Sequence, residues 1–265
     1  MNFSQLIDAV RRHPEAVTIP GSWSQGRACF GGLMAALLFE AMRANVASER
    51  VVRSLAITFV GPAAPDVPIS FEVEILRQGG AVSSLLGRAV QNGAVVTLIQ
   101  GSFGAPRASV IDIPALPAVA MKSLDESPEL PYVEGATPEF IRHLAMRWAV
   151  GGMPFTNTPS RSLGGWVRLR GDVVEEPVTE AHLLALVDAW PPATLPYLSK
   201  PAAGSTLTWT IEFVQPVSGL STLDWCRYCA TIEHSRDGYG HAAAALWTAE
   251  GELLAISRQT VTVFA

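Results

Sequence analysis

The sequence predicts an α+β protein built from one structural unit that occurs twice. Two observations predict this fold class: in each half an apolar helix precedes a run of strand-like segments, and short turn sequences recur at a nearly constant spacing. Since the strands follow one another instead of alternating with helices, a Rossmann or α/β-hydrolase plan is disfavoured. Residues 106–138 contain many prolines and little periodicity, which predicts a linker between an N-terminal unit (residues 1–105) and a C-terminal unit (residues 139–265).

The first half begins with a short helix over residues 3–11, whose apolar residues share one face. Residues 17–23 are interpreted as a strand. The segment that follows Gly31 and Gly32, residues 33–44, is apolar nearly all round, which predicts a buried helix that starts at the glycine pair. Strands are then expected over residues 54–60, 69–78, 82–91 and 95–103, with Asn92-Gly93 as the hairpin turn between the last two.

The second half is predicted to repeat this order. Strands are expected over residues 141–149 and 165–170, followed by an apolar helix over residues 180–190 that ends before Pro191-Pro192. Four more strands are expected over residues 205–213, 223–233, 240–248 and 253–264, with Glu250-Gly251 in the hairpin position.

Two turn sequences support an internal repeat. Phe59-Val60-Gly61-Pro62 matches Phe213-Val214-Gln215-Pro216 at a spacing of 154 residues (59 to 213), and Asn92-Gly93 matches Glu250-Gly251 at a spacing of 158 (93 to 251). Chance similarity between short turns is the alternative explanation. The shared order of helix and strands favours duplication.

Composition bounds the class of protein. The chain has 265 residues, of which 49% are hydrophobic and 16% are charged, so it can bury a sizeable core. The net charge of -5 disfavours a nucleic-acid binder. It does not exclude an anionic ligand that binds at a local basic patch. No apolar run reaches the roughly 20 residues of a membrane span. With no recognisable signal peptide and only 3 cysteines, a cytoplasmic location is expected.

Several common catalytic signatures are missing from the sequence. It has no G-x-S-x-G, G-x-G-x-x-G or Walker motif, and its 5 histidines show no zinc-ligand spacing, so neither a metal nor a cofactor is predicted. Cys226 and Cys229 form a C-x-x-C sequence within an expected strand, where residues three apart point to opposite faces. We therefore interpret them as structural residues, not as a redox or zinc pair.

Five short sequences resemble the acyl-CoA thioesterase II family. They are Gly26–Gly32 leading into the apolar helix, Glu74–Gly80, Val90–Gly93, Gly165–Arg170 and Leu186–Asp188. In this order they span nearly the whole chain outside the linker. The resemblance implies a double hot-dog fold, that is, two tandem units each with an antiparallel sheet wrapped around a central helix. It also implies a homodimer, a role in lipid metabolism, and hydrolysis of acyl-CoA to a free acid and CoA.

The resemblance implies a catalytic trio of aspartate, threonine and glutamine in the C-terminal half. The aspartate on the second helix is Asp188, the threonine before the aromatic-x-x-Pro turn is Thr206, and the glutamine in the last strand is Gln259. Thr206 and Gln259 rest on the resemblance alone. Asp188 is also a lone carboxylate at the end of an apolar helix, where the alternative is an ordinary solvated aspartate.

Thioester hydrolysis requires residues of these types. A water molecule must be placed against the carbonyl carbon, and donors must meet the developing oxyanion. Asp188 is predicted to polarise that water as a general base, with Thr206 and Gln259 holding it by hydrogen bonds. Gly31 and Gly32 are predicted to bind the substrate, because N–H groups at a helix start are unsatisfied and glycine permits close approach.

Departures from the family pattern leave alternatives open. Leu33 stands where the family often has glutamine, and residues 208–212 also differ, so acyl chain length and retained activity are not fixed by the sequence. A hot-dog hydratase would need a histidine five residues after the helix aspartate, where this chain has Ala193. A non-catalytic acyl-CoA-binding protein is the other alternative. Because the halves carry different residues, we expect one active site per chain.

Overall fold

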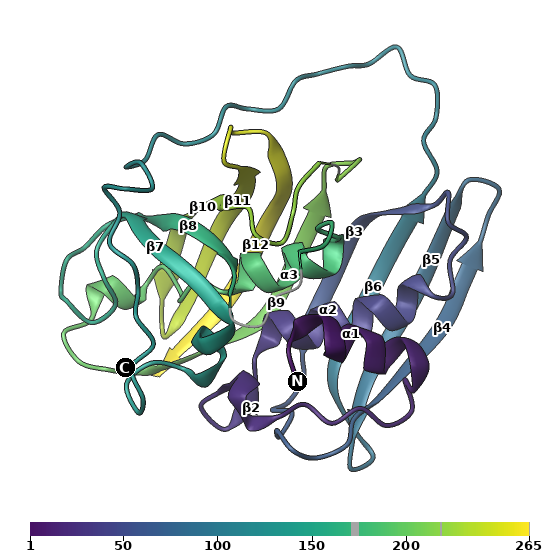
Figure 1. Cartoon of the computed structure of the whole chain (residues 1–265), viewed down its shortest axis with the longest axis horizontal. Coiled ribbons are helices and arrows are strands. Elements are labelled where there is room, and N and C mark those ends of the chain that lie inside the picture. Colours follow the sequence, from purple (N-terminus) through teal and green to yellow (C-terminus); the bar gives the residue numbers. More distant parts are fainter. Residues whose placement is uncertain (171–174, 218, 265) are drawn as a thin grey trace.

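The computed structural model describes residues 1–170, 175–217 and 219–264. Within these residues the chain forms a 10-stranded antiparallel sheet, with helices α2 (Gly31–Arg43) and α3 (Glu180–Asp188) lying across one face (Figure 1). The predicted α+β class is confirmed. The strands of this sheet are β3 (Val51–Phe59), β4 (Ser70–Gln78), β5 (Val82–Gln91), β6 (Ala94–Gly104), β7 (Leu144–Val150), β8 (Ser162–Leu169), β9 (Ala203–Phe213), β10 (Cys226–Arg236), β11 (Tyr239–Thr248) and β12 (Leu253–Phe264).

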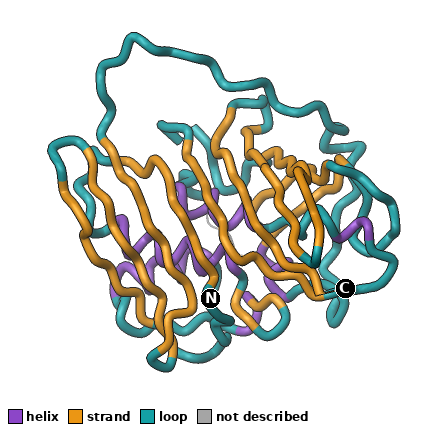
Figure 2. Tube along the Cα trace, turned by 180° about the vertical axis from the view of Figure 1, so that it is seen from behind, coloured by secondary structure: helices purple, strands orange, loops and turns teal. Residues whose placement is uncertain are grey.

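The strand order repeats in the two halves. The sheet runs β4-β5-β6-β3-β9-β12-β11-β10-β8-β7, and the strands lie side by side when seen from behind (Figure 2). Antiparallel pairing of β3 with β9, with Ala56 opposite Thr210, joins the halves. In each half the first strand after the buried helix, β3 or β9, lies at this joint. The other three follow outward in the order fourth, third and second, which is β6, β5 and β4 in the first half and β12, β11 and β10 in the second. This shared order supports the internal repeat, to which the second half adds β8 and β7.

Apolar composition explains why the two central helices are buried. In α2 every residue from Gly32 to Met42 is buried, and the helix begins at Gly31 as predicted. In α3 every residue from Ala181 to Val187 is buried. Thr179 caps α3, and its backbone N–H donates to the His182 ring at 3.0 Å. Both helices therefore pack as core elements between the sheet and the N-terminal segment.

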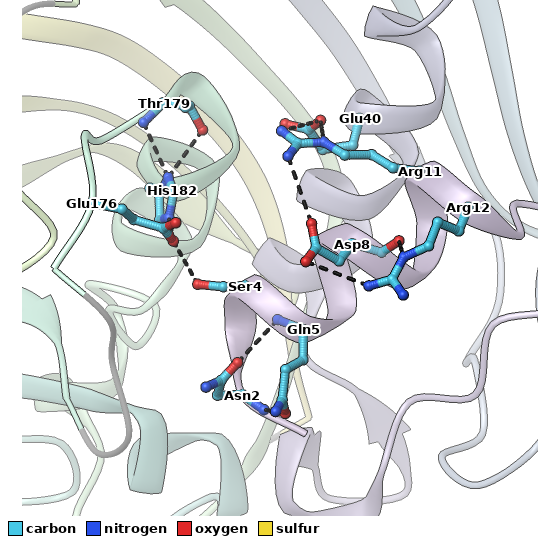
Figure 3. Close-up of polar contacts among 10 residues, drawn as sticks. All are labelled: Asn2, Ser4, Gln5, Asp8, Arg11, Arg12, Glu40, Glu176, Thr179 and His182. Carbon is cyan, nitrogen blue, oxygen red and sulfur yellow. Dashed lines mark hydrogen bonds and ion pairs between the residues drawn. The ribbon is translucent and has the colours of Figure 1, made fainter.

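Helix α1 (Phe3–Arg12) lies against α2 and fixes the N-terminus to both halves (Figure 3). Its apolar face is buried, and the Ser4 hydroxyl donates to Glu176 of the second half at 2.5 Å. The Arg11 guanidinium donates to the Glu40 carboxylate on α2 at 3.0 Å. Glu40 is only 6% exposed, so Arg11 compensates a charge that would otherwise be buried without a partner.

Two expected strands differ from the structure. Residues 17–23 are not a strand: Val17 makes a single bridge to Ile69, and Gly21–Trp23 forms a 3₁₀ helix. Pro20 explains this, since it has no N–H to donate to a strand ladder. In the second half, Glu139–His143 is also a 3₁₀ helix, so β7 begins at Leu144 and not at residue 141. A short hairpin of β1 (Ser24–Gln25) and β2 (Ala28–Cys29) was not expected.

The segment between the halves is long and largely exposed. After β6 it arches past one edge of the molecule (Figure 1). Apolar residues such as Val110 and Leu116 are exposed along it. The units 1–105 and 139–265 stay a prediction as domains, because their strands belong to one sheet. Cys226 and Cys229 lie in β10 as expected, and both are free thiols. None of the described helices is long and apolar enough to cross a membrane.

Replacement of Arg11 by alanine is expected to destabilise the fold in a pH-dependent way. Burial raises the pKa of Glu40, and the Arg11 charge opposes that rise. Without Arg11 the ionised carboxylate is buried without its ion-pair partner. We expect the free energy of unfolding to fall by about 1–3 kcal/mol, which is less than for a fully buried ion pair because Arg11 is half exposed. The loss should be largest at alkaline pH and should shrink as falling pH protonates Glu40. Urea unfolding at pH 5 and pH 8 measures it.

Arg12→Ala is the matched control. Arg12 is 71% exposed on the same helix, and among the described residues it pairs only with the Asp8 carboxylate and carbonyl, so its loss should change stability by less than about 0.5 kcal/mol. The double variant Arg11→Ala/Glu40→Gln should recover most of the stability at pH 8. Equal losses for Arg11→Ala and Arg12→Ala would contradict the assignment.

Candidate active site

Asp188 and Gln259 are in direct contact. Asp188 is the last residue of α3, and Gln259 lies in β12, the strand that pairs with both β9 and β11. The Gln259 amide nitrogen donates to Asp188 Oδ1 at 2.8 Å. The structure thus brings together two of the three side chains that the family resemblance singled out.

The glycine pair at the start of α2 meets the same carboxylate. The Gly32 backbone N–H donates to Asp188. A Cβ placed on Gly31 would lie 2.9 Å from Asp188 Oδ2, and one on Gly32 would lie 2.9 Å from the Asp188 Cβ. Both distances are shorter than side chains tolerate, so the two glycines allow the helix start and the carboxylate to approach. Gly32 thus directs its backbone N–H to Asp188 and not away from the helix pair.

Burial changes the acidity of Asp188. Packing around the carboxylate removes water and raises its pKa to about 7, although the hydrogen bonds from Gln259 and the Gly32 backbone act in the opposite direction. The residue as a whole is partly exposed, unlike its neighbours Val187 and Ala189. A carboxylate that titrates near neutrality can take and return a proton at physiological pH.

Thr206 lies on the same face of the sheet as Gln259 because of an irregularity in β9. Trp209 lies opposite Gln259 and Thr208 opposite Thr260, but the next pair is Thr206 with Val261, so Leu207 is an extra residue. Without that bulge, strict alternation would turn Thr206 to the outer face. Among the described contacts, the Thr206 hydroxyl bonds to neither Asp188 nor Gln259. The structure therefore places Thr206 on the face that Gln259 occupies, without a direct bond to the pair, and its role stays a prediction.

Aromatic rings that the sequence did not single out support the glycine pair. The Phe59 ring at the end of β3 lies 3.1 Å from a Cβ placed on Gly31. The Phe30 ring lies beside Gly32 and stacks on Phe140 of the second half, with centroids 4.1 Å apart. The Phe59 position was visible in the repeated turn sequence, but the Phe30–Phe140 stack joins residues far apart in the chain and leaves no local signal.

Comparison with known families matches both halves of the chain. The family model described as "Acyl-CoA thioesterase N-terminal domain" matches residues 19–104, and the one described as "Acyl-CoA thioesterase C-terminal domain" matches residues 124–263. The chain belongs to the acyl-CoA thioesterase family. A curated relative, acyl-CoA thioesterase 2 of Haemophilus influenzae, is 24% identical over 251 residues, which cover 88% of this chain and 86% of that protein.

Solved structures similar to this acyl-CoA thioesterase family member confirm the hot-dog fold. A conserved protein with a hot-dog fold from Alicyclobacillus acidocaldarius superposes with a TM-score of 0.82 at 22% identity, over 94% of this chain and 92% of that one. An acyl-CoA thioesterase II from Mycobacterium marinum superposes with a TM-score of 0.74 at 20% identity, over the same shares of 94% and 92%. At these identities the likeness concerns the fold alone, and it agrees with two tandem units.

Gly32→Ala should damage both the fold and the geometry of the site. The added methyl group would meet the Phe30 ring at 2.6 Å and the Asp188 Cβ at 2.9 Å, which overpacks a buried helix start. We expect a loss of about 1–3 kcal/mol in the free energy of unfolding. Chemical denaturation measures the loss. Gly61→Ala is the control, because nothing lies within 4 Å of a Cβ there, and it should leave stability nearly unchanged.

Proposed function

We propose that the protein hydrolyses an acyl-CoA thioester to a free acid and CoA, with Asp188 polarising a water molecule that Thr206 and Gln259 hold. The observation that carries the proposal is the contact of Asp188 with Gln259 at the start of helix α2. Family membership supports acyl-CoA as the substrate class. The residues themselves supply a base, an amide, a hydroxyl and a helix start, which together suit attack of water on a carbonyl.

In the proposed reaction, Asp188 takes a proton from water as the water oxygen attacks the thioester carbonyl carbon. Its pKa near 7 makes this transfer accessible at neutral pH. The Gly31 N–H at the start of α2 is the proposed donor to the carbonyl oxygen, since first-turn N–H groups have no helical partner. Collapse of the intermediate breaks the C–S bond. Asp188 then returns its proton to the CoA thiolate, which leaves as the thiol.

Gln259 has two roles in this proposal. Its amide N–H holds one oxygen of Asp188, which fixes the orientation of the carboxylate. Its amide oxygen is an acceptor and can take a hydrogen bond from the attacking water. Thr206, on the same face two strand positions away, can contribute its hydroxyl to that water. The alternative function, acyl-CoA binding without turnover, uses the same site and differs only in the chemical step.

The rate of thiol release is expected to rise with pH and to level off above pH 7. Hydrolysis requires ionised Asp188, whose pKa of about 7 sets the midpoint. Below that midpoint the rate should fall about tenfold per pH unit. A pH profile of kcat with an acyl-CoA thioester measures it. A protein that binds acyl-CoA but releases no thiol at any pH would favour the binding function.

Asp188→Asn should lower activity by about 100-fold or more while the fold becomes more stable at pH 8. The folded pKa of about 7 lies above the ordinary 3.8, so ionisation of buried Asp188 costs stability as pH rises from about 4 to about 7. Asparagine removes that cost. Thermal unfolding at pH 8 checks that the variant is folded. Full activity in this variant would exclude Asp188 as the base.

Gln259→Ala is expected to shift the midpoint of the pH profile upward. The amide hydrogen bond lowers the pKa of Asp188, so its loss should raise that pKa beyond 7, in addition to slowing the reaction. Gln215→Ala is the control, since Gln215 donates to Glu180 at the other end of α3. Its profile should keep the wild-type midpoint. An unshifted midpoint in Gln259→Ala would show that Gln259 does not set the pKa of the catalytic base.

Three expectations from the sequence stay predictions. They are the homodimer, the role in lipid metabolism and the cytoplasmic location. Light scattering on the purified chain tests the first, because a homodimer should have twice the 28.3 kDa mass of one chain.

A further inference from the structure

The inner face of the sheet places one large side chain directly beside Gln259. Trp209 of β9 is the cross-strand partner of Gln259 in β12, and such partners share a face with Cβ atoms about 5 Å apart. Trp209 is 0% exposed, whereas Gln259 keeps partial exposure. On its other side Gln259 lies opposite Ala242 of β11, which carries only a methyl group. The two neighbouring strands therefore give Gln259 one bulky side and one open side.

A hydrogen bond to β12 itself fixes the indole of Trp209. The indole N–H donates to the Ser257 hydroxyl at 2.9 Å, and Ser257 is only 2% exposed. Ser257 lies two residues before Gln259, so both side chains point to the same face of the strand. Because the register pairs Ser257 with Ile211, the indole crosses diagonally from β9 to β12. It therefore occupies the space on the Ser257 side of Gln259.

The position of Gln259 matters because one orientation of its amide serves Asp188. In that orientation the amide nitrogen donates to Asp188 Oδ1 at 2.8 Å. A glutamine side chain samples several staggered rotamers, and fixing it in one of them costs entropy. An indole on the Ser257 side excludes rotamers that would turn the amide in that direction. Less entropy is then lost when the bond to Asp188 forms.

The proposed mechanism leaves Trp209 without a role. It belongs to residues 208–212, which depart from the family pattern. Its partner in β3 is Ile57, a residue that is 1% exposed, so the ring belongs to the apolar core. A phenylalanine would also fill such a core. The indole adds an N–H, and that N–H is bound to the strand that carries Gln259.

We propose that Trp209 is a positioning residue: its indole, anchored on Ser257, holds the Gln259 amide in contact with Asp188. This inference rests on the proposed function, in which Asp188 is the base and Gln259 orients it. Trp209 acts only through Gln259 and does not itself contact the reacting atoms. Ser257 contributes by accepting the hydrogen bond that fixes the indole.

The test measures the pKa of Asp188 in Trp209→Phe, from the pH profile of kcat and from an NMR titration of the Asp188 carboxyl carbon, which needs no turnover. The Gln259 bond lowers that pKa, so a loosened amide should move the midpoint upward, by less than Gln259→Ala does. We expect kcat to fall by about 10-fold, since a displaced amide orients the carboxylate only part of the time. Tyr228, whose pKa burial and the Asp188 charge both raise, stays protonated and leaves the midpoint unaffected.

Ser257→Ala is the second variant, and it removes only the oxygen atom that accepts the indole N–H. It should move the midpoint in the same direction as Trp209→Phe. Because so little volume is lost, it keeps the test available if Trp209→Phe does not fold, which chemical denaturation shows.

Trp247→Phe is the matched control. Trp247 of β11 is also buried, at 6% exposed, and its indole nitrogen has no hydrogen-bond partner among the described residues. Its partner in β12 is Leu253, well away from Gln259 along the strand. The variant loses the same atoms from a buried ring as Trp209→Phe does. It should nevertheless keep the wild-type midpoint.

Trp209→Phe in a Gln259→Ala background separates positioning from a general loosening of the core. If Trp209 acts only through Gln259, the double variant should have the midpoint of Gln259→Ala alone. A further upward shift would overturn the inference. An unshifted midpoint in Trp209→Phe and Ser257→Ala, alongside a shifted one in Gln259→Ala, would overturn it while the proposed function stands. A wild type that releases no thiol would overturn the proposed function, and the NMR titration would then decide by itself whether Trp209 holds the Gln259–Asp188 pair.

Discussion

The close approach between the first turn of α2 and the last residue of α3 is the constraint on which the candidate site depends. Two glycines make it possible, because a methyl group on either would lie 2.9 Å from Asp188 atoms. A helix start stabilises a nearby carboxylate by about 0.3–2 kcal/mol, which would lower the pKa of Asp188. Burial opposes this and is the stronger effect, since the pKa rises to about 7. The result is a carboxylate that is held in place yet able to exchange a proton.

Pairing of β3 with β9 makes that approach possible across two halves of the chain. One continuous sheet supports both helices, so the end of α3 and the start of α2 keep a fixed relation. The sequence predicted much of this arrangement, because its signals are local. Apolar composition marked α2 and α3, alternation marked most strands, and the repeated turn of Phe59 and Phe213 lies at the ends of the two joining strands.

Features that escaped prediction depend on contacts between distant residues. The bulge at Leu207 is set by the register of β9 against β12, and no glycine or proline beside it predicts a bulge from the sequence. The sequence gives no sign that the Tyr228 ring stacks on Trp190, two residues after Asp188. The family resemblance supplied Thr206 and Gln259, whereas the sequence could not show that Gln259 bonds directly to the carboxylate and that Thr206 has no described bond to it. Residues 17–23 failed as a strand because one proline outweighed their apolar pattern.

The helix pair carries a second carboxylate in a matching place. Glu40 lies in the last turn of α2, and its interaction with Glu180 shows that it faces the first turn of α3, as Asp188 faces the first turn of α2. The two ends differ in what meets the acid: a neutral amide at Asp188 and the Arg11 cation, brought by α1, at Glu40. The two ends of the helix pair thus hold a carboxylate in two different ways, one by an uncharged hydrogen bond and the other by a cation from a separate helix.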